Sequence, residues 1–366
     1  MTDLLQRMLD MDASDLHLAA NTPPIVRVHG ELKPISDLEP LSPSDTKQLA
    51  YSVLTEQQKK RLEEALEIDF SFGLKGLARF RGNIYHQRGA VGAVFRLIPM
   101  AIKSFEQLRL PAVVAKLCER PRGLILVTGP TGSGKSTTLA AMLDRINTTY
   151  PHHILTLEDP IEFVHLNKRA LVNQREIQSD THSFASALRV ALRQDPDVVL
   201  IGEMRDLETI EAALRIAETG HLTFATLHTN SAASTINRII DVFPAHQQSQ
   251  IRTQLSLVLE GILCQSLLPR RGGGRVMAME ILIPNPAIRN LVREDKVHQI
   301  YSSMQTGQDK YGMITFNQSL LQLVLSKQIE VQTALNASSL PDELQELLKR
   351  AQAAAAPGAV GAAPRR

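Results

Sequence analysis

The sequence predicts a two-domain α/β protein, with a small mixed domain at the amino-terminal end and a larger domain built on a parallel sheet. The chain has 366 residues, which is more than a single average hydrophobic core supports. Between residues 70 and 97, strand-like stretches are separated by glycines, as is typical of an antiparallel sheet. From Gly123 onward, apolar strands alternate with helical patterns, as is typical of a parallel sheet covered by helices.

The predicted domain boundaries follow these changes in pattern. We expect a small domain over residues 1–98, a connection over 99–111, a large domain with carboxyl-terminal helices over 112–350, and a disordered tail over 351–366. Within the small domain, residues 25–29 form a short β-type run and residues 46–66 carry apolar side chains near helical spacing. The tail, AQAAAAPGAVGAAPRR, has too few large apolar side chains to offset the entropy cost of ordering.

The large domain divides into alternating elements. The candidate strands are residues 124–128, 154–158, 198–202 and 222–226, and the candidate helices are 136–147, 183–194 and 207–218. The third helix follows Asp206 and precedes Gly220, in agreement with the helix dipole and the glycine preference at helix ends. After residue 248 we predict mainly helices, interrupted by a flexible stretch at 270–274, with further helical faces at 320–325 and 344–348.

Composition excludes several classes of protein. The net charge is +2 and no long Lys/Arg block occurs, so we do not expect a dedicated nucleic-acid binder. The apolar runs are far shorter than the roughly 20 residues that span a bilayer, so we expect a cytoplasmic protein. Cys118 and Cys264 stand alone, which argues against a zinc site or a disulfide and favours buried thiols.

The run GPTGSGKS at residues 129–136 has the P-loop spacing and lies between an apolar strand and a helix. Its glycines allow backbone N–H groups to surround phosphate oxygens, and the following helix directs its positive end at the same anion. Lys135 should reach the β- and γ-phosphates of ATP, and the Ser136 hydroxyl should bind Mg²⁺. A glycine-rich turn with a solvated lysine is the simpler alternative. The predicted nucleotide-binding residues are Gly129, Pro130, Thr131, Gly132, Ser133, Gly134, Lys135, Ser136 and Thr137.

Two acidic strand ends follow the P-loop in the sequence. VVLIGEMRD brings Glu203 to the carboxyl edge of the sheet, where open α/β sheets bind ligands, and ILTLEDPIEF brings Glu158 and Asp159 there. We expect one carboxylate to lie near Mg²⁺ and another to activate water as a general base. An acid after an aliphatic strand is also common without function, and Asp159 with Pro160 can form a simple turn.

Histidines and arginines supply further candidates. GHLTFATLHTN places His221 and His228 at opposite ends of one strand, so they cannot both touch one ligand atom, and only His228 lies at the carboxyl end, where it could sense the γ-phosphate. The four arginines of RFRGNIYHQRGAVGAVFR form either a solvated basic face or a source of arginine fingers for a neighbouring subunit. They are Arg79, Arg81, Arg88 and Arg96.

The order P-loop, LEDPIEF, VVLIGEMRD and GHLTFATLHTN resembles the secretion-ATPase superfamily, the hexameric motors of type II secretion, type IV pili and related systems. Within it the chain most resembles the type IV pilus retraction ATPases, from SDLHL near Ser14 to AIRNLVRE at residues 287–294. Two isolated cysteines cannot supply the four-cysteine zinc loop usual in the assembly and secretion ATPases. The alanine- and proline-rich tail leaves the accessory paralogue of the retraction ATPase as an alternative.

The resemblance implies a RecA-like P-loop ATPase domain, a smaller amino-terminal PAS-like domain, and a homohexamer that uses ATP and Mg²⁺. It places Glu158 in the Asp box and Glu203 in Walker B, and we lean towards Glu158 as the base and Glu203 at Mg²⁺. Both histidines fall on the His box, and AIRNLVRE matches a segment associated with retraction. Arg81 and Arg96 fall where the small domain of the family faces the nucleotide. The implied catalytic residues are Glu158, Glu203, Lys135, His228, Arg81 and Arg96.

The partners implied are copies of the same chain, an inner-membrane platform protein of the pilus machinery and a paralogous ATPase, at the cytoplasmic face of the membrane. Two other classes compete with this motor. A nucleotide-gated binding module would not require the two carboxylates, because binding alone needs no water-activating acid. A nucleic-acid motor of RecA-like fold would require a basic groove, and the near-neutral charge argues against it.

Overall fold

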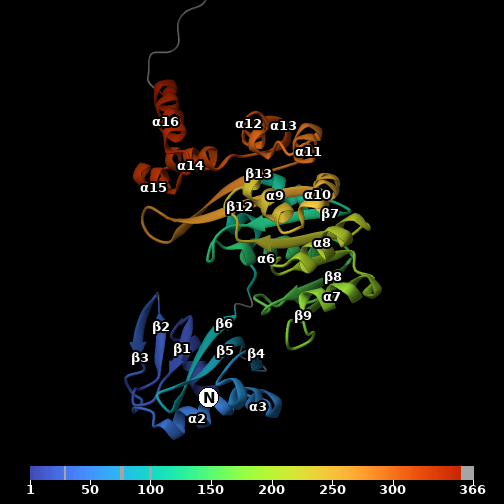
Figure 1. Cartoon of the computed structure of the whole chain (residues 1–366). Helices are drawn as coiled ribbons and strands as arrows, with labels where there is room; N and C mark the ends of the chain where they lie inside the picture. Colours follow the sequence, from blue (N-terminus) through green and yellow to red (C-terminus); the bar gives the residue numbers. More distant parts are fainter. Residues whose placement is uncertain (29, 75–77, 99–100, 356–366) are drawn as a thin grey trace, which may run out of the picture. The chain divides into compact units, whose positions relative to one another are not determined.

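The protein is described here by a computed structural model, which covers residues 1–28, 30–74, 78–98 and 101–355. The chain divides into two compact units (Figure 1). The small unit comprises Met1–Ile102, Glu158–Leu166 and Gln174–Thr181, and the large unit comprises the remainder. The sequence-based boundaries had assigned residues 158–166 and 174–181 to the large domain. Among the described residues, no helix has both the length and the apolar character needed to cross a membrane.

The small unit contains a six-stranded antiparallel sheet in the order β3-β2-β1-β6-β5-β4 (Figure 1). Its strands are β1 (Asp15–Leu18), β2 (Ile25–Val28), β3 (Glu31–Pro34), β4 (Glu67–Leu74), β5 (Ala78–Gln87) and β6 (Ala90–Ile98). Its helices are α1 (Thr2–Asp10), α2 (Pro43–Tyr51) and α3 (Glu56–Ala65). The helical spacing over residues 46–66 therefore belongs to two helices, each of which begins with a capping box.

Alternation along the strands gives this sheet one apolar face and one polar face. Phe80 and Phe95 are fully buried and share a core with residues of all three helices, among them Leu5 and Leu62. A Cβ atom on Gly82 would lie 2.6 Å from the Phe70 ring, so only glycine leaves room for this aromatic packing. The opposite face carries Arg79, Arg81 and Arg96, because the pleat turns alternate residues of β5 and β6 away from the core.

The large unit contains a seven-stranded sheet (Figure 1). Its strand order is β13-β12-β7-β11-β10-β8-β9. Its strands are β7 (Gly123–Thr128), β8 (His153–Glu158), β9 (Leu171–Glu176), β10 (Val198–Ile201), β11 (Leu222–Leu227), β12 (Leu259–Pro269) and β13 (Arg275–Leu282). The run from β12 to β8 is parallel. The predicted fold class is confirmed, since an antiparallel sheet with helices is joined to a parallel sheet covered by helices, and β7, β8, β10 and β11 match the four predicted strands to within one residue at each end.

Thirteen α-helices among the described residues belong to the large unit. They are α4 (Phe105–Leu108), α5 (Ala112–Leu117), α6 (Lys135–Thr149), α7 (Phe184–Ala191), α8 (Leu207–Glu218), α9 (Ala232–Asp241), α10 (Ala245–Val258), α11 (Pro286–Arg293), α12 (Ile300–Thr306), α13 (Gln308–Tyr311), α14 (Phe316–Leu325), α15 (Val331–Ala337) and α16 (Pro341–Ala355). A short 3₁₀ turn follows α7 at Leu192–Gln194, and another follows α11 at Val297–Gln299. The predicted helix over 183–194 thus ends early, and α8 has the predicted bounds.

The prediction of mainly helical structure after residue 248 was wrong for the segment that forms β12 and β13. Most of β12 is buried, so its apolar residues run together without the polar alternation that marks a half-exposed strand. The predicted flexible stretch at 270–274 is the turn between the two strands, where Gly272, Gly273 and Gly274 have φ angles of 80°, 103° and 75°.

The predicted disordered tail over 351–366 was also wrong at its start. Residues 351–355 are helical and complete α16, because the alanines at these positions are strong helix formers that continue an existing helix. Residues 356–366 lie outside the described residues. The connection predicted over 99–111 contains α4, and its Pro99 and Met100 are likewise outside the described residues.

Candidate active site

The P-loop lies where β7 meets α6. Every residue of β7 is buried, and the chain leaves this strand at the carboxyl edge of the parallel sheet. Gly129, Gly132 and Gly134 have φ angles of 140°, 78° and 89°, which residues with a Cβ atom rarely adopt. Helix α6 begins at Lys135, so Ser136 and Thr137 lie in its first turn, where backbone N–H groups have no partner within the helix.

The backbone of the P-loop packs directly against β12. A Cβ atom on Gly129 would lie 2.2 Å from the backbone oxygen of Gln265, so no side chain fits between the loop and the strand. Gln265 is buried, and its Nε2 donates a hydrogen bond to the backbone oxygen of Ser133 at 2.8 Å. Sequence reasoning missed Gln265, because it lies 132 residues after Ser133 in a segment that was predicted to be helical.

Lys135 turns its ammonium group back over the loop. The Nζ atom donates to the backbone oxygens of Gly129 at 2.8 Å and Pro130 at 3.2 Å. These contacts keep the positive charge beside the N–H groups that would surround a phosphate. An entering anion would therefore meet the ammonium group and the positive end of α6 together.

Glu203 and His228 meet at the same edge of the sheet. Glu203 follows β10 and His228 follows β11, and β11 lies between β10 and the P-loop strand β7. The His228 Nε2 atom lies 3.1 Å from Glu203 Oε1. Arg205, which the sequence reasoning did not single out, donates from Nε to Oε1 at 2.6 Å and from Nη2 to Oε2 at 2.7 Å. Its place two residues after the Walker-B glutamate was the available signal.

The surroundings of Glu203 lower the pKa of its carboxyl group. Partial burial acts to raise this pKa, but the hydrogen bond from Arg205 and the electrostatic interactions with His228 and Arg205 outweigh it. The side chain is therefore an ionised carboxylate near neutral pH. A carboxylate with a lowered pKa is a poor general base but a good acceptor for the water shell of a metal ion such as Mg²⁺.

Glu158 is the last residue of β8, which ends at the same sheet edge, and its side chain is only 9% exposed. Its Oε1 accepts a hydrogen bond from Gln174 Nε2 at 3.2 Å, and its Oε2 accepts one from the Glu162 N–H at 3.4 Å. Asp159 is exposed, and the peptide bond between Asp159 and Pro160 is cis. Glu158 and Asp159 therefore differ in environment, because Glu158 is buried and Asp159 is exposed.

His221 lies at the other end of β11 from His228, as the sequence predicts. Its Nδ1 atom is 3.2 Å from the Thr219 hydroxyl oxygen and 3.2 Å from the Ile216 backbone oxygen. These partners belong to the end of α8, so His221 fastens that helix end to the start of the strand. His228 is the only one of the two histidines at the carboxyl edge.

On the polar face of the small sheet, Arg81 and Arg96 are direct neighbours across β5 and β6, and Asp15 on β1 is the next residue in the same row. Arg96 donates from Nε to Asp15 Oδ1 at 2.7 Å, although its own side chain is 67% exposed. Asp15 is almost fully buried and also accepts a hydrogen bond from Ser14 at 2.7 Å. The carboxylate therefore fixes the stem of Arg96 and leaves the rest of the side chain accessible.

The other two arginines of the basic motif have separate positions. Arg79 donates from Nη2 to the Ser71 hydroxyl at 2.7 Å and to the buried Glu176 carboxylate at 3.1 Å, so its charge is neutralised within the small unit. Arg88 has a φ angle of 46° and forms the turn between β5 and β6 with Gly89. Arg88 is exposed in that turn, and Arg81 and Arg96 are the exposed arginines that lie on the strands of the motif.

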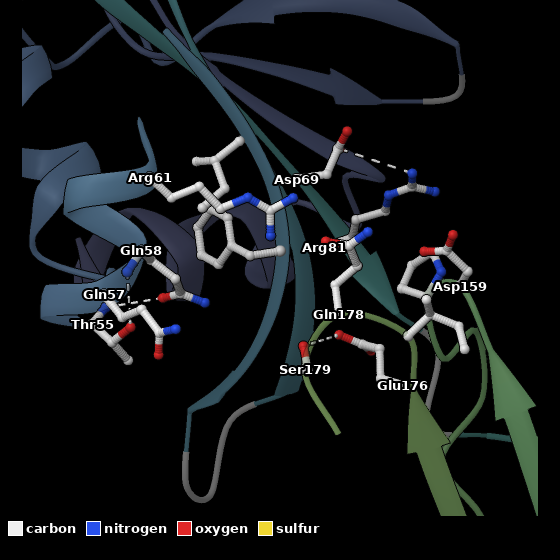
Figure 2. Close-up of a pocket in the computed structure, with 14 residues that line it drawn as sticks. Thr55, Gln57, Gln58, Arg61, Asp69, Arg81, Asp159, Glu176, Gln178 and Ser179 are labelled. Atoms are coloured by element: carbon white, nitrogen blue, oxygen red, sulfur yellow. Dashed lines mark hydrogen bonds and ion pairs between the residues drawn. The ribbon is translucent and has the colours of Figure 1, made fainter. Parts of the chain in front are cut away.

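A cavity of about 470 Å³ lies beside Arg81 in the small unit (Figure 2). Arg61 of α3 contributes a second guanidinium group, while Asp69, Asp159 and Glu176 contribute carboxylates. Arg81 reaches Asp69 only at 3.9 Å, and its side chain is 46% exposed. The lining is therefore of mixed charge and does not select one sign of ligand.

The segment AIRNLVRE forms most of α11, whose Ile288 and Val292 are buried. Arg289 turns inward: its Nη1 donates to the Ser256 backbone oxygen at the end of α10 at 2.7 Å, and its Nη2 donates to Glu260 at 2.9 Å. Glu260 is also paired with Arg120 at 3.2 Å, just before β7. Arg289 therefore stabilises the junction of α10 and β12.

The donor set fits Mg²⁺ bound mainly by ligand oxygens. Ser136 offers a hydroxyl in the first turn of α6, and Glu203 offers an ionised carboxylate. In the part of the chain that the structure describes, no group of three or more His, Cys, Asp or Glu side chains could hold a metal ion. This is the pattern of sites in which phosphate oxygens and water complete the Mg²⁺ shell.

Comparison with known families bears on all of these features. The sequence profile of the type II/IV secretion system protein family matches residues 103–349. The chain belongs to this family. The match covers the P-loop, Glu203, His228 and α11.

The sequences of individual family members confirm the resemblance to the type IV pilus retraction ATPases. The type IV pilus retraction ATPase PilT of Pseudomonas aeruginosa is 53% identical over 93% of this chain and 98% of its own length. A twitching motility protein of Neisseria gonorrhoeae is 54% identical over 82% of this chain and 80% of its own. The P. aeruginosa ATPase PilU, over 94% of this chain and 90% of its own, is only 40% identical.

A solved structure gives the same result. The crystal structure of the pilus retraction motor PilT with bound ADP has a TM-score of 0.90 and 53% identity, over 94% of this chain and 99% of that one. The bound ADP is a property of that relative, and it agrees with the nucleotide predicted from the P-loop of this chain.

Asp15 gives a pH test of the Arg96 arrangement. Burial acts to raise the pKa of Asp15, but hydrogen bonds from Ser14 and Arg96 outweigh it and lower the pKa. A carboxyl group whose pKa is lower in the folded state stabilises the fold at pH values above its unfolded-state pKa of about 3.9. This stability is lost as the pH falls through the folded-state pKa. We expect Asp15→Asn to lower the free energy of unfolding by about 1–3 kcal/mol at pH 7 and by less below pH 4.

Chemical denaturation at several pH values measures this difference. Asp69→Asn is the control, because Asp69 is exposed and lies 3.9 Å from Arg81. A difference between Asp15→Asn and the parent that stays constant from pH 7 to pH 3 would contradict the assignment.

Proposed function

We propose that the chain is a motor ATPase that hydrolyses ATP with Mg²⁺ and drives retraction of the type IV pilus. The observation that carries the proposal is the P-loop at the carboxyl edge of the sheet, with Lys135 over its mouth and ionised Glu203 two strands away. The similarity to PilT over almost the full length of both chains supports the retraction role. A nucleotide-gated binding module is disfavoured, because such a module needs no second buried acid such as Glu158.

Nucleotide binding rests on residues 129–137. The loop N–H groups and the start of α6 hold the phosphate oxygens, while Lys135 moves from its backbone partners to the β- and γ-phosphates. Ser136 and, through water, Glu203 would hold Mg²⁺, which when bound would supply positive charge beside the phosphate oxygens. Excess negative charge in the transition state is thus met by fixed positive groups.

Hydrolysis requires a group that takes a proton from the attacking water. We assign this role to Glu158: water attacks the γ-phosphorus, the bond to the ADP oxygen breaks, and the water proton passes to the Glu158 carboxylate. Glu203 is the weaker candidate for the base, because Arg205 and His228 lower its pKa. We assign His228 to sensing the γ-phosphate, and its contact with Glu203 supports this role.

Arg81 and Arg96 complete the proposed site. Their guanidinium groups are the accessible ones on the polar face of the small sheet, and Asp15 keeps Arg96 in place. In a homohexameric ring they would stabilise charge on the transferring phosphate, which is a large effect in other P-loop enzymes. Release of the products would then let the small unit move, and the ring would pass that motion to a platform protein of the pilus machinery at the inner membrane.

Lys135→Ala tests the site. We expect a fall in kcat/KM for ATP of at least about 100-fold, because the ammonium group meets charge that grows in the transition state. Phosphate release by the purified full-length chain measures it. Lys349→Ala is the control, since Lys349 is an exposed lysine that pairs with Glu346 at 3.1 Å. Equal rates for parent and Lys135→Ala would place the catalytic site elsewhere.

A matched pair of variants distinguishes the roles of Glu158 and Glu203. We expect Glu158→Gln to lower kcat by about 100-fold or more with little change in ATP affinity, since it removes a proton acceptor. Glu203→Gln should instead raise the Mg²⁺ concentration needed for half-maximal rate by about tenfold. A Mg²⁺ titration of both variants measures this. The reverse pattern would exchange the two roles.

Deletion of the gene tests the direction of work. A retraction motor is needed to withdraw pili, so we expect cells without it to lose twitching motility and to carry more surface pili. Electron microscopy and a surface-motility assay measure both, and a strain producing the Lys135→Ala variant should behave like the deletion. Cells without pili would indicate assembly instead.

A further inference from the structure

Gln265 of β12 lies directly beneath the P-loop. Its side-chain Nε2 donates to the Ser133 oxygen at 2.8 Å, its backbone oxygen would contact a Cβ on Gly129 at 2.2 Å, and its Nε2 would contact one on Gly134 at 3.3 Å. Gln265 and Ser133 are each only 2% exposed. One residue of a strand outside the motif therefore lies against both ends of the loop, with its backbone at Gly129 and its side chain at Ser133 and Gly134.

The hydrogen bond fixes the direction of a peptide group. In a planar trans peptide, the C=O and N–H bonds point in opposite directions. Because the Ser133 C=O is held towards Gln265, the N–H of Gly134 in the same peptide group points away from β12. Because β12 packs against the other side of the loop, this N–H points to the side on which a bound phosphate would lie.

We infer that Gln265 is a positioning residue that aims the Gly134 N–H at the nucleotide phosphates. The inference rests on the proposed function, because it assigns a further residue to the same nucleotide site. Gln265 does not touch the nucleotide itself and acts through the Ser133 peptide group. Its contribution should therefore be seen in ADP as well as in ATP binding.

Two buried atoms near this contact distinguish positioning from ordinary packing. Among the described residues, Gln265 Oε1 and Ser133 Oγ are buried without a hydrogen-bond partner. A buried polar atom without a partner normally costs stability, so a side chain selected for stability alone would be apolar here. The presence of an amide here is thus better explained by the hydrogen bond that it donates to the Ser133 backbone oxygen.

Gln265→Met provides the test, since methionine has a similar length but no N–H group. We expect the Kd for ADP with Mg²⁺ to rise about tenfold, which corresponds to the loss of one ordinary hydrogen bond. The melting temperature should change by no more than about 3 °C, because the substitution also removes the partnerless Oε1. At saturating ATP, kcat should stay within about threefold of the parent while KM rises, since the phosphate contact exists before and during the reaction.

Calorimetric titration of the full-length chain with ADP and Mg²⁺ measures the affinity, and thermal unfolding measures the stability. Gln248→Met is the matched control: Gln248 Nε2 also donates to a backbone oxygen, that of Phe243 at 3.0 Å, but in α10. Its Kd for ADP should equal that of the parent. Gln265→Glu, which replaces the donor by an acceptor, should bind ADP more weakly than Gln265→Met.

Equal ADP affinity of Gln265→Met and the parent would overturn the inference, whatever the melting temperature. If the parent binds ADP and Lys135→Ala does not, that result leaves the proposed function intact. A parent chain that failed to bind ADP would overturn the proposed function and the inference together.

Discussion

Close packing of the P-loop backbone against strand β12 is the constraint on which the nucleotide site depends. The glycines at 129, 132 and 134 supply the φ angles, but an anion is bound only if the peptide groups between them are held in fixed directions. Strand β12 provides that support through its backbone at Gln265 and the side-chain bond to Ser133. The motif and the strand are far apart in sequence, and the parallel pairing of β12 with β7 brings them together.

A second constraint shapes the small unit, where one sheet must be apolar on one face and basic on the other. The phenylalanines of β4, β5 and β6 pack against three helices, and the strand pleat then turns the intervening arginines outward. Like charges opposite each other on neighbouring strands repel. Asp15 relieves this between Arg81 and Arg96, because its buried carboxylate binds Arg96 and fixes it. The basic face can therefore exist without unfolding the sheet.

The fold was predictable where local chemistry decides it, and the same local chemistry selected the candidate site residues. The P-loop spacing, the acid at the end of an apolar strand and the glycine-separated strands each depend on a few adjacent residues, and these elements were placed correctly. The hairpin of β12 and β13 was not, because a strand buried on both faces lacks the alternation that distinguishes it from a buried helix. Gln265 was missed with it. Arg205 and Asp15 were missed because their value lies in partners that only the folded chain brings close, namely Glu203 and Arg96.

In helix α11, contacts within the chain determine which side chains remain exposed to other molecules. Arg289 is occupied by the end of α10 and by Glu260, and Ile288 and Val292 are buried. The outer side of the helix consists instead of exposed Ala287, Asn290, Arg293 and Glu294. Asn290 contacts both Arg293 and Glu294 through its amide, at 3.0 and 2.8 Å. Any protein that docks on this helix would thus recognise a small, polar and nearly neutral strip, although the sequence of the segment contains two arginines.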